Sequence, residues 1–163
     1  MNEPLLEVKN LSQRFPLTKG LWQELRIENS KLVRRPRQVH AVNDISFTVD
    51  RGEVFSVVGE SGCGKSTTAR TVIKLIEPRS GQIIYDGVDI TAYNAKQMLP
   101  FRRKMQMVFQ NPYASLNPRH TIKRILTEPM LFHKVAATRR EAEDKANALL
   151  EKVGLRSEQA DRF

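Results

Sequence analysis

The residues best suited to chemistry form one short glycine-rich segment, Gly59-Glu60-Ser61-Gly62-Cys63-Gly64-Lys65-Ser66. Its Gly-x-x-x-x-Gly-Lys-Ser spacing is that of a phosphate-binding loop, because the glycines let the backbone curl and point successive amide N–H groups inward at a helix start. In such a loop Lys65 reaches the β- and γ-phosphates, Ser66 gives its hydroxyl to Mg²⁺ and Thr67 contacts the α-phosphate. The segment therefore predicts a site for a Mg-nucleotide, ATP, formed by Gly59, Ser61, Gly62, Cys63, Gly64, Lys65, Ser66 and Thr67.

Cys63 is the single cysteine of the sequence and lies inside this loop. The helix terminus and Lys65 could make its thiol reactive. We favour the simpler interpretation that a small side chain fits there and that its backbone amide is the functional part. One cysteine cannot form an internal disulfide or a multi-cysteine metal site, and the three histidines, His40, His120 and His133, lack metal-ligand spacing.

Strand and helix patterns surround the loop in the order that a phosphate-binding loop requires. Residues 54–58, Val-Phe-Ser-Val-Val, are apolar on both faces and predict a central parallel strand directly before it. Residues 66–76 carry apolar side chains at helical spacing, and residues 77–81 end that helix. Upstream, the alternation of residues 5–15 and 41–49 predicts two further strands.

The remaining segments have weaker patterns. Residues 16–38 are basic and without periodicity, so we expect an inserted loop with room for one helical turn. Residues 82–90 predict a small hairpin that turns at Asp86-Gly87, residues 95–104 a short basic helix, and residues 105–109 a strand.

The final helix has the clearest local signals. Thr138 and Glu141 have capping-box spacing at its start, and Gly154 is expected just past its end. Its predicted apolar stripe consists of Ala142, Ala146, Leu149, Leu150 and Val153.

Composition and charge are those of a globular domain with an anionic partner, but they do not identify that partner. The chain has 163 residues, of which 40% are hydrophobic, and a formal charge of +9, which suits a nucleotide, a nucleic acid or an anionic membrane face. Aromatics are sparse among the second group of basic residues, so a solvated face is favoured over a nucleic-acid groove; this group is Arg102, Arg103, Lys104, Arg119, Lys123 and Arg124. No apolar run approaches the roughly 18 to 20 residues that span a bilayer, and we expect a cytoplasmic protein.

Two motifs together resemble a known family. The loop through Thr67, combined with Met107-Val108-Phe109-Gln110-Asn111-Pro112-Tyr113-Ala114-Ser115-Leu116-Asn117-Pro118-Arg119, is similar to the ATP-binding subunits of ABC transporters. The insertion and the ending Lys152-Val153-Gly154-Leu155 resemble the dipeptide, oligopeptide and nickel importer branch. The resemblance implies an α/β fold, a P-loop NTPase of the ABC ATPase type, with an incomplete core sheet, an antiparallel β-arm and the start of a helical subdomain.

The resemblance also assigns domains and roles by position. Residues 1–163 would be the N-terminal portion of an ATP-binding domain, with residues 1–110 as nucleotide-binding core and residues 111–163 as Q-loop and first part of the helical subdomain. Gln110 matches the Q-loop glutamine, which contacts Mg²⁺ and the attacking water. Residues 113–119 lie where the family docks coupling helices. Phe15 matches the adenine-stacking aromatic, with His40 as the alternative.

The family implies an energy-coupling subunit of an importer for peptides or similar solutes. Its partners would be transmembrane permeases, a second ATP-binding subunit and, indirectly, an extracytoplasmic solute-binding protein, with the chain peripheral on the inner membrane face and no nucleic acid bound. The sequence contains neither Leu-Ser-Gly-Gly-Gln nor an apolar strand that ends in Asp-Glu. We therefore expect a truncated chain that binds ATP but hydrolyses it poorly. The alternatives are a soluble ABC-type ATPase that acts on nucleic acid or ribosomes, and a non-functional nucleotide-binding fragment.

Overall fold

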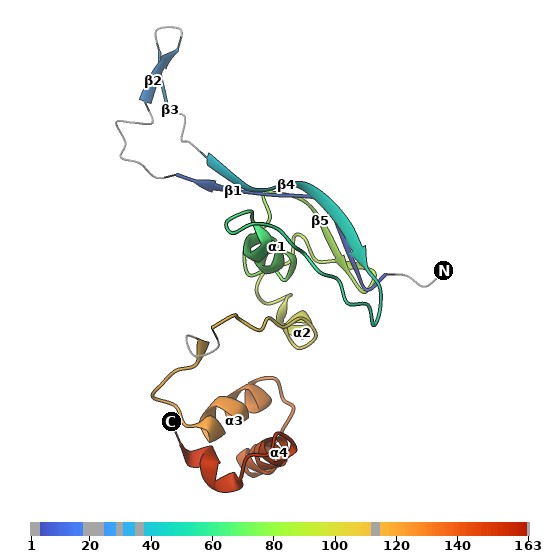
Figure 1. The fold of residues 1–163 in the computed structure, drawn as a ribbon, viewed down its shortest axis with the longest axis vertical. Coiled ribbons are helices and arrows are strands. Elements are labelled where there is room, and N and C mark those ends of the chain that lie inside the picture. Colours follow the sequence, from blue (N-terminus) through green and yellow to red (C-terminus); the bar gives the residue numbers. More distant parts are fainter. Residues whose placement is uncertain (1–3, 18–24, 29–30, 35–37, 112–114, 163) are drawn as a thin grey trace. The chain divides into compact units, whose positions relative to one another are not determined.

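The computed structural model describes residues 4–17, 25–28, 31–34, 38–111 and 115–162. The chain forms two compact units, Met1–Arg102 and Arg103–Phe163, which are considered separately below. Figure 1 shows the elements of each unit along the chain.

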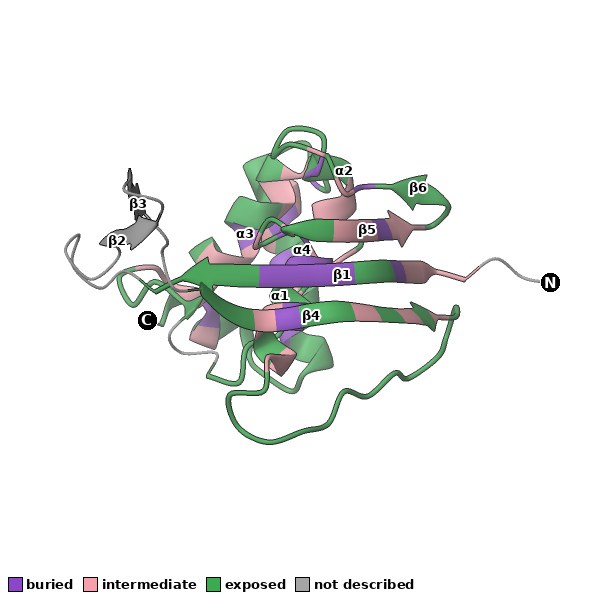
Figure 2. Cartoon of the chain, turned by 90° about the horizontal axis from the view of Figure 1, so that it is seen from above, coloured by how far each residue is buried: buried purple, intermediate pink, exposed green. Residues whose placement is uncertain are grey.

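A four-stranded antiparallel sheet organises the first unit, in the order β4 (Gln38–Val49), β1 (Leu6–Pro16), β5 (Ser80–Tyr85) and β6 (Val88–Asp89). The two strands predicted upstream of the loop are confirmed as β1 and β4. The predicted hairpin is also confirmed, since β5 and β6 pair around Asp86 and Gly87, whose φ values are 52° and 74°. Figure 2 shows β1 between β4 and β5, with buried residues in its middle.

The pairing of β1 with β4 contains an extra residue on β4. Gln13 pairs with Val42, but the next residue, Arg14, pairs with His40, which leaves Ala41 without a partner on β1. Such a bulge bends its strand and re-aims the backbone of the extra residue. The sequence offered no signal for it, and it proves to lie beside the glycine loop.

Helix α1 (Lys65–Val72) packs against β1 and β4 and completes the core of this unit. The helix predicted over residues 66–76 is confirmed but ends earlier, because Lys74 adopts a positive φ of 57°. Arg102, the last residue of the short helix α2 (Leu99–Arg102), donates hydrogen bonds to the carbonyls of Ile73 and Lys74. The core includes Val8, Leu11, Val42, Val72 and Ile83.

The two strands predicted next to the ligand-binding motifs do not form. Residues 54–58 and 105–109 are irregular, and Val54, Val58 and Val108 are 91%, 88% and 92% exposed. Among the described residues no strand pairs with either segment, and apolar character alone does not make a strand. The one aromatic contact recorded for the first segment is a stack of Phe55 on Phe47, with ring centroids 4.8 Å apart.

The basic insertion contains strands where a helical turn was expected. Strands β2 (Leu25–Glu28) and β3 (Lys31–Arg34) pair as a separate two-stranded antiparallel sheet. Each strand is only four residues long, and the residues of β3 do not alternate, which explains why the sequence pattern did not reveal the hairpin. Residues 18–24, 29–30 and 35–37 of the insertion lie outside the described residues.

The second unit is helical, with α3 (Ile122–Phe132), α4 (Arg139–Lys152) and a 3₁₀ helix, η3 (Ser157–Asp161). The predicted cap of α4 is confirmed: the Thr138 hydroxyl accepts from the Glu141 N–H at 3.2 Å. The Glu141 carboxylate accepts from the N–H of Ala137 at 2.8 Å, one residue earlier than a strict capping box requires. Gly154 has a φ of 77° after the helix end, as predicted.

The apolar stripe of α4 is only partly buried. Ala142, Ala146 and Leu150 are buried, whereas Leu149 and Val153 are 44% and 70% exposed. Within this unit α4 packs on α3 and η3, and these cover one side of the helix. Across the described part of the chain, no helix is both long enough and apolar enough to cross a membrane.

Candidate nucleotide-binding site

The glycine loop leads directly into the first turn of α1, as the sequence predicted. Gly62 and Gly64 adopt positive φ values of 82° and 99°, which only glycine reaches without strain. Gly64 is the N-cap of α1 and has no side chain to satisfy the first amides. The first helical hydrogen bond runs from the Thr68 N–H to the Gly64 carbonyl at 2.8 Å, so the amides of residues 65–67 are the free N–H groups of a helix start, whereas the Cys63 N–H donates to the Glu60 carbonyl at 3.4 Å.

Gly64 is also fixed by a close approach of the sheet. A Cβ atom at this position would lie 2.1 Å from the carbonyl oxygen of Ala41, the extra residue of the β4 bulge. The same atom would lie 4.0 Å from the Cγ2 of Val42. The bulge therefore brings the Ala41 carbonyl so close to the loop that Gly64 has no room for a side chain.

Lys65 folds back over the loop that precedes it. Its ammonium group donates to the carbonyls of Gly59 at 2.7 Å and Glu60 at 2.6 Å, and lies 3.6 Å from the sulfur of Cys63. Cys63 is exposed, with its sulfur 2.7 Å from where a Cβ on Gly59 would be. The loop thus places a cation and a helix N-terminus together, an arrangement that attracts anions.

The hydroxyl side chains expected at the phosphates lie at the same helix start. Ser66 is exposed, and Thr67 is half-buried one position further along α1. Ser61 and Gly62 are exposed in the loop itself. All eight predicted loop residues are therefore neighbours in the first unit, grouped around the N-terminus of α1.

The two adenine-stacking candidates project from opposite faces of the sheet. Phe15, 37% exposed, pairs with Val39, whereas His40 pairs with Arg14. Cross-strand partners share a face and successive residues alternate, so Phe15 is on the face of Gln13 and His40 on the other.

Gln110 belongs to the second unit, where it is exposed at the end of the irregular residues 105–109. Gln110 therefore does not follow a strand, although the sequence predicted one over residues 105–109. Of residues 113–119, which the resemblance assigns to docking, Tyr113 and Ala114 lie outside the described residues.

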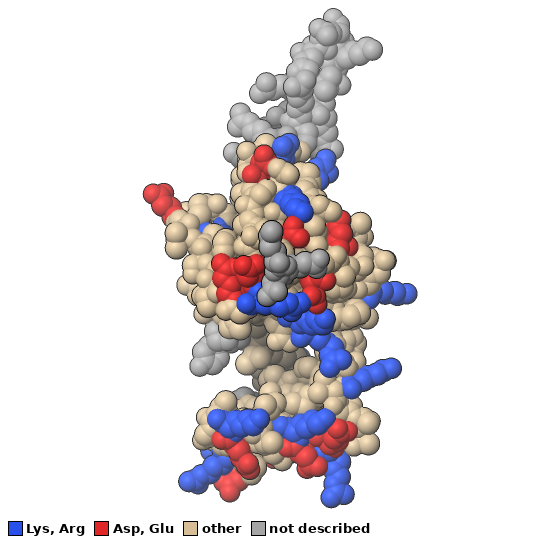
Figure 3. All heavy atoms as spheres, turned by 90° about the vertical axis from the view of Figure 1, so that its right-hand side faces the viewer, with Lys and Arg blue, Asp and Glu red and all other residues tan. Residues whose placement is uncertain are grey.

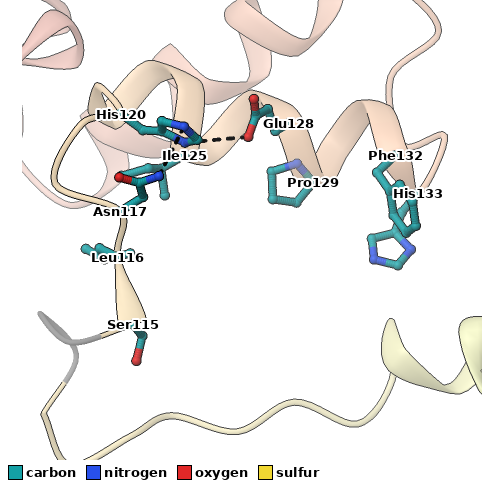
Figure 4. A pocket seen from close by; sticks show the side chains of 9 residues that line it. All are labelled: Ser115, Leu116, Asn117, His120, Ile125, Glu128, Pro129, Phe132 and His133. Carbon is teal, nitrogen blue, oxygen red and sulfur yellow. Dashed lines mark hydrogen bonds and ion pairs between the residues drawn. The ribbon is translucent and has the colours of Figure 1, made fainter. Parts of the chain in front are cut away.

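A pocket of about 730 Å³, which the sequence did not indicate, lies in this second unit. Figure 4 shows His120, Asn117 and Glu128 at one side of it and Phe132 with His133 at the other. His120 Nδ1 lies 3.7 Å from Glu128 Oε2, and Arg124 donates to Glu128 at 2.6 Å, which lowers the pKa of that carboxyl. The pocket is lined by Ser115, Leu116, Asn117, His120, Ile125, Glu128, Pro129, Phe132 and His133.

Several charged side chains of the second unit form ion pairs with one another. Figure 3 shows Lys and Arg alternating with Asp and Glu on its surface. Three pairs are Lys123 with Asp161 at 2.7 Å, Arg139 with Glu143 at 3.2 Å, and Lys145 with Glu141 at 2.7 Å. This is a mixed, solvated face and not a uniform basic groove. The parts of the chain that the structure describes contain no cluster of three His, Cys, Asp or Glu residues able to hold a metal ion.

Comparison with known families supports the class that the loop defines. Residues 42–163 match the family described as ABC transporter. The chain belongs to this family, and its fold is that of the ABC ATPase cassettes.

Two curated relatives illustrate the similarity. The chain is 43% identical over 164 residues to the oligopeptide transport ATP-binding protein OppF of Bacillus subtilis (strain 168), which covers 100% of the chain and 48% of the relative. It is 45% identical over 161 residues to the glutathione import ATP-binding protein GsiA of Pectobacterium atrosepticum, covering 99% of the chain and 24% of the relative. The chain thus spans about half or less of the length of these relatives.

Solved structures show the same fold. A dimeric ATP-binding cassette with ADP and phosphate bound, 20% identical, superposes with a TM-score of 0.73 over 96% of the chain and 60% of the cassette. The ATP-binding subunit of an ABC transporter, 27% identical, gives a TM-score of 0.66 over 98% of the chain and 54% of the subunit.

Proposed function

We propose that the chain is the ATP-binding part of an energy-coupling subunit of an ABC importer for peptides or similar solutes. The observation that carries this proposal is the glycine loop at the N-terminus of α1, with the Lys65 ammonium held against the Gly59 and Glu60 carbonyls. The names of the relatives, which import oligopeptides and glutathione, support the class of solute.

The loop residues have distinct roles in this proposal. The amides of Gly59, Ser61, Gly62, Cys63 and Gly64 surround the phosphates, and Lys65 leaves its two carbonyl partners for the β- and γ-phosphate oxygens. This exchange is favourable because an ammonium–phosphate contact is charge-assisted on both sides. Thr67 contacts the α-phosphate.

Magnesium fits the donor set at the start of α1. Mg²⁺ usually keeps several waters and takes only one or two protein ligands beside the phosphates, so one exposed hydroxyl, that of Ser66, is a sufficient loop contribution. When bound, the ion neutralises phosphate charge. We assign Gln110 as the second ligand and as the residue that orients the attacking water. We assign adenine stacking to Phe15, since it shares the sheet face that supports α1 and His40 does not.

The remaining assignments follow from the same role. Residues 1–110 form the nucleotide-binding core, and residues 111–163 the Q-loop and the first part of the helical subdomain. The chain works on the inner face of the membrane with permease subunits, a second ATP-binding subunit and, indirectly, a solute-binding protein. Residues 113–119 dock the permeases, and three of them, Ser115, Leu116 and Asn117, line the pocket of the second unit.

Titration of Mg-ATP into the chain and into Lys65→Ala tests the nucleotide site. We expect Lys65→Ala to weaken binding at least about 100-fold, which corresponds to the loss of a strong charge-assisted contact. Lys96→Ala is the matched control, because it removes one charge from the same unit at an exposed position outside the loop. Unchanged affinity in Lys65→Ala would overturn the proposal.

Phosphate release tests the expectation that the 163-residue chain alone binds ATP but hydrolyses it poorly. The sequence holds no Leu-Ser-Gly-Gly-Gln segment and no apolar strand that ends in Asp-Glu. Steady-state turnover by the chain should equal that of the Lys65→Ala blank. Turnover clearly above this blank would contradict the expectation.

A further inference from the structure

Gln13, in the middle of β1, carries an amide with an unsatisfied oxygen. The residue is 7% exposed, and its Oε1 is the one buried side-chain oxygen or nitrogen without a hydrogen-bond partner within the described parts of the chain. Buried polar groups are nearly always paired, and an unpaired one is destabilising. An apolar side chain of the same size would be more favourable for the fold alone.

The position of Gln13 places this amide beside the glycine loop. Gln13 pairs directly with Val42 across the β1–β4 ladder, so the two side chains share one face of the sheet. Val42 projects toward the loop, because its Cγ2 lies 4.0 Å from the Cβ position of Gly64, the N-cap of α1. Gln13 therefore lies on the face that supports the start of α1.

Two buried hydroxyls of the surrounding elements already have partners. Ser12, next to Gln13 on β1, accepts from the Asp44 N–H at 2.9 Å. Thr71, on α1, donates to the carbonyl of Thr67 at 2.8 Å. The amide oxygen of Gln13 is thus an acceptor without a donor, on the sheet face that carries the glycine loop.

We propose that Gln13 is a nucleotide-binding residue: its side-chain oxygen accepts a hydrogen bond from the nucleoside part of the nucleotide held by the glycine loop. This inference rests on the proposed function. An acceptor oxygen cannot pair with ionised phosphate oxygens, which are acceptors too, whereas a ribose hydroxyl and the exocyclic amine of adenine both donate. Three rotatable bonds let the side chain turn toward the ligand, and its Oε1 gives up no hydrogen bond in doing so.

Gln13→Met removes the hydrogen-bonding atoms and keeps the length of the side chain. We expect Mg-ATP to bind about three- to tenfold more weakly, the effect of one neutral hydrogen bond. Binding of Mg-tripolyphosphate should not change, because it has no nucleoside. The melting temperature of the ligand-free variant should be equal or higher, because an unpaired polar group has been replaced by an apolar one.

Two further ligands identify the donor. If Gln13→Met binds both ATP and GTP more weakly but 2′,3′-dideoxy-ATP with unchanged affinity, the contact is to the ribose hydroxyls. If Gln13→Met binds ATP and its dideoxy analogue more weakly but GTP with unchanged affinity, the contact is to the adenine amine. Gln97→Met is the matched control, since the Gln97 amide is exposed and already accepts from the Asn94 N–H at 2.9 Å.

Three results would overturn the inference. Unchanged ATP affinity with a lower melting temperature would mean that Gln13 is structural, as would unfolding of both Gln13→Met and Gln13→Leu. Equal weakening for tripolyphosphate would mean that Gln13 acts through the loop. If the unaltered chain bound no ATP at all, the proposed function itself would fail, which is a different outcome from binding that ignores Gln13.

Discussion

Gly64→Ala should be severely destabilising because two separate costs act at this position. At a φ of 99° an alanine is in the left-handed half of conformational space, which costs roughly 1–2 kcal/mol. Its Cβ would lie 2.1 Å from the Ala41 carbonyl oxygen, so loop and strand would have to separate. Overpacking of this kind costs about 1–3 kcal/mol. The sum, about 2–5 kcal/mol, is a large part of the stability of a small domain.

Gly62→Ala separates the two costs. Gly62 has a similar φ of 82° in the same loop, but a Cβ there would have no heavy atom within 4 Å. This variant should therefore lose only the roughly 1–2 kcal/mol of backbone strain. Urea denaturation of both variants without nucleotide, followed by circular dichroism, measures the difference. Equal losses would show that the bulge at Ala41 does not press on Gly64, and would refute the reasoning.

Two smaller predictions concern stability. Thr138→Ala removes the hydroxyl that caps α4 and should cost about 1 kcal/mol in thermal unfolding, whereas a cap with no energetic role would leave the melting temperature unchanged. Hydrogen bonds from the side chains of Thr91 and then Gln82 hold the pKa of Asp89 below its usual value of 3.8. A lowered folded-state pKa means that this stabilisation is complete above about pH 4 and is lost as the pH falls further. Asp89→Asn should flatten that acid limb, and an unaltered slope would contradict the assignment.

The loop and its helix could be predicted because their signals are local. Gly62 and Gly64 indicate positive φ values, because glycine adopts them without strain. Thr138 indicates a helix start, because its hydroxyl accepts a hydrogen bond from the first turn. The strands β1 and β4 were visible because apolar and polar residues alternate over part of each, and in β4 the apolar Ile45, Phe47 and Val49 are less exposed than the residues between them.

The features that the sequence did not predict depend on distant parts of the chain. Residues 54–58 have every local property of a buried strand, but a parallel strand exists only where neighbours pair with it. The bulge at Ala41 arises because β4 has one more residue than β1 between two successive pairs. No property of Ala41 itself reveals this difference. The burial of Gln13 follows from that pairing, and a glutamine on a strand otherwise suggests a solvent-facing position.

The exposed residues 54–58 also have a consequence for the behaviour of the chain in concentrated solution. Val-Phe-Ser-Val-Val has high β-propensity, no charge and no proline, and Val54 and Val58 are almost fully accessible. Such a segment can stack with identical segments of other molecules into cross-β ladders. Overexpression of the chain by itself should therefore direct much of it into inclusion bodies, and Val58→Lys, which interrupts the run with a charge, should return more of it to the soluble fraction.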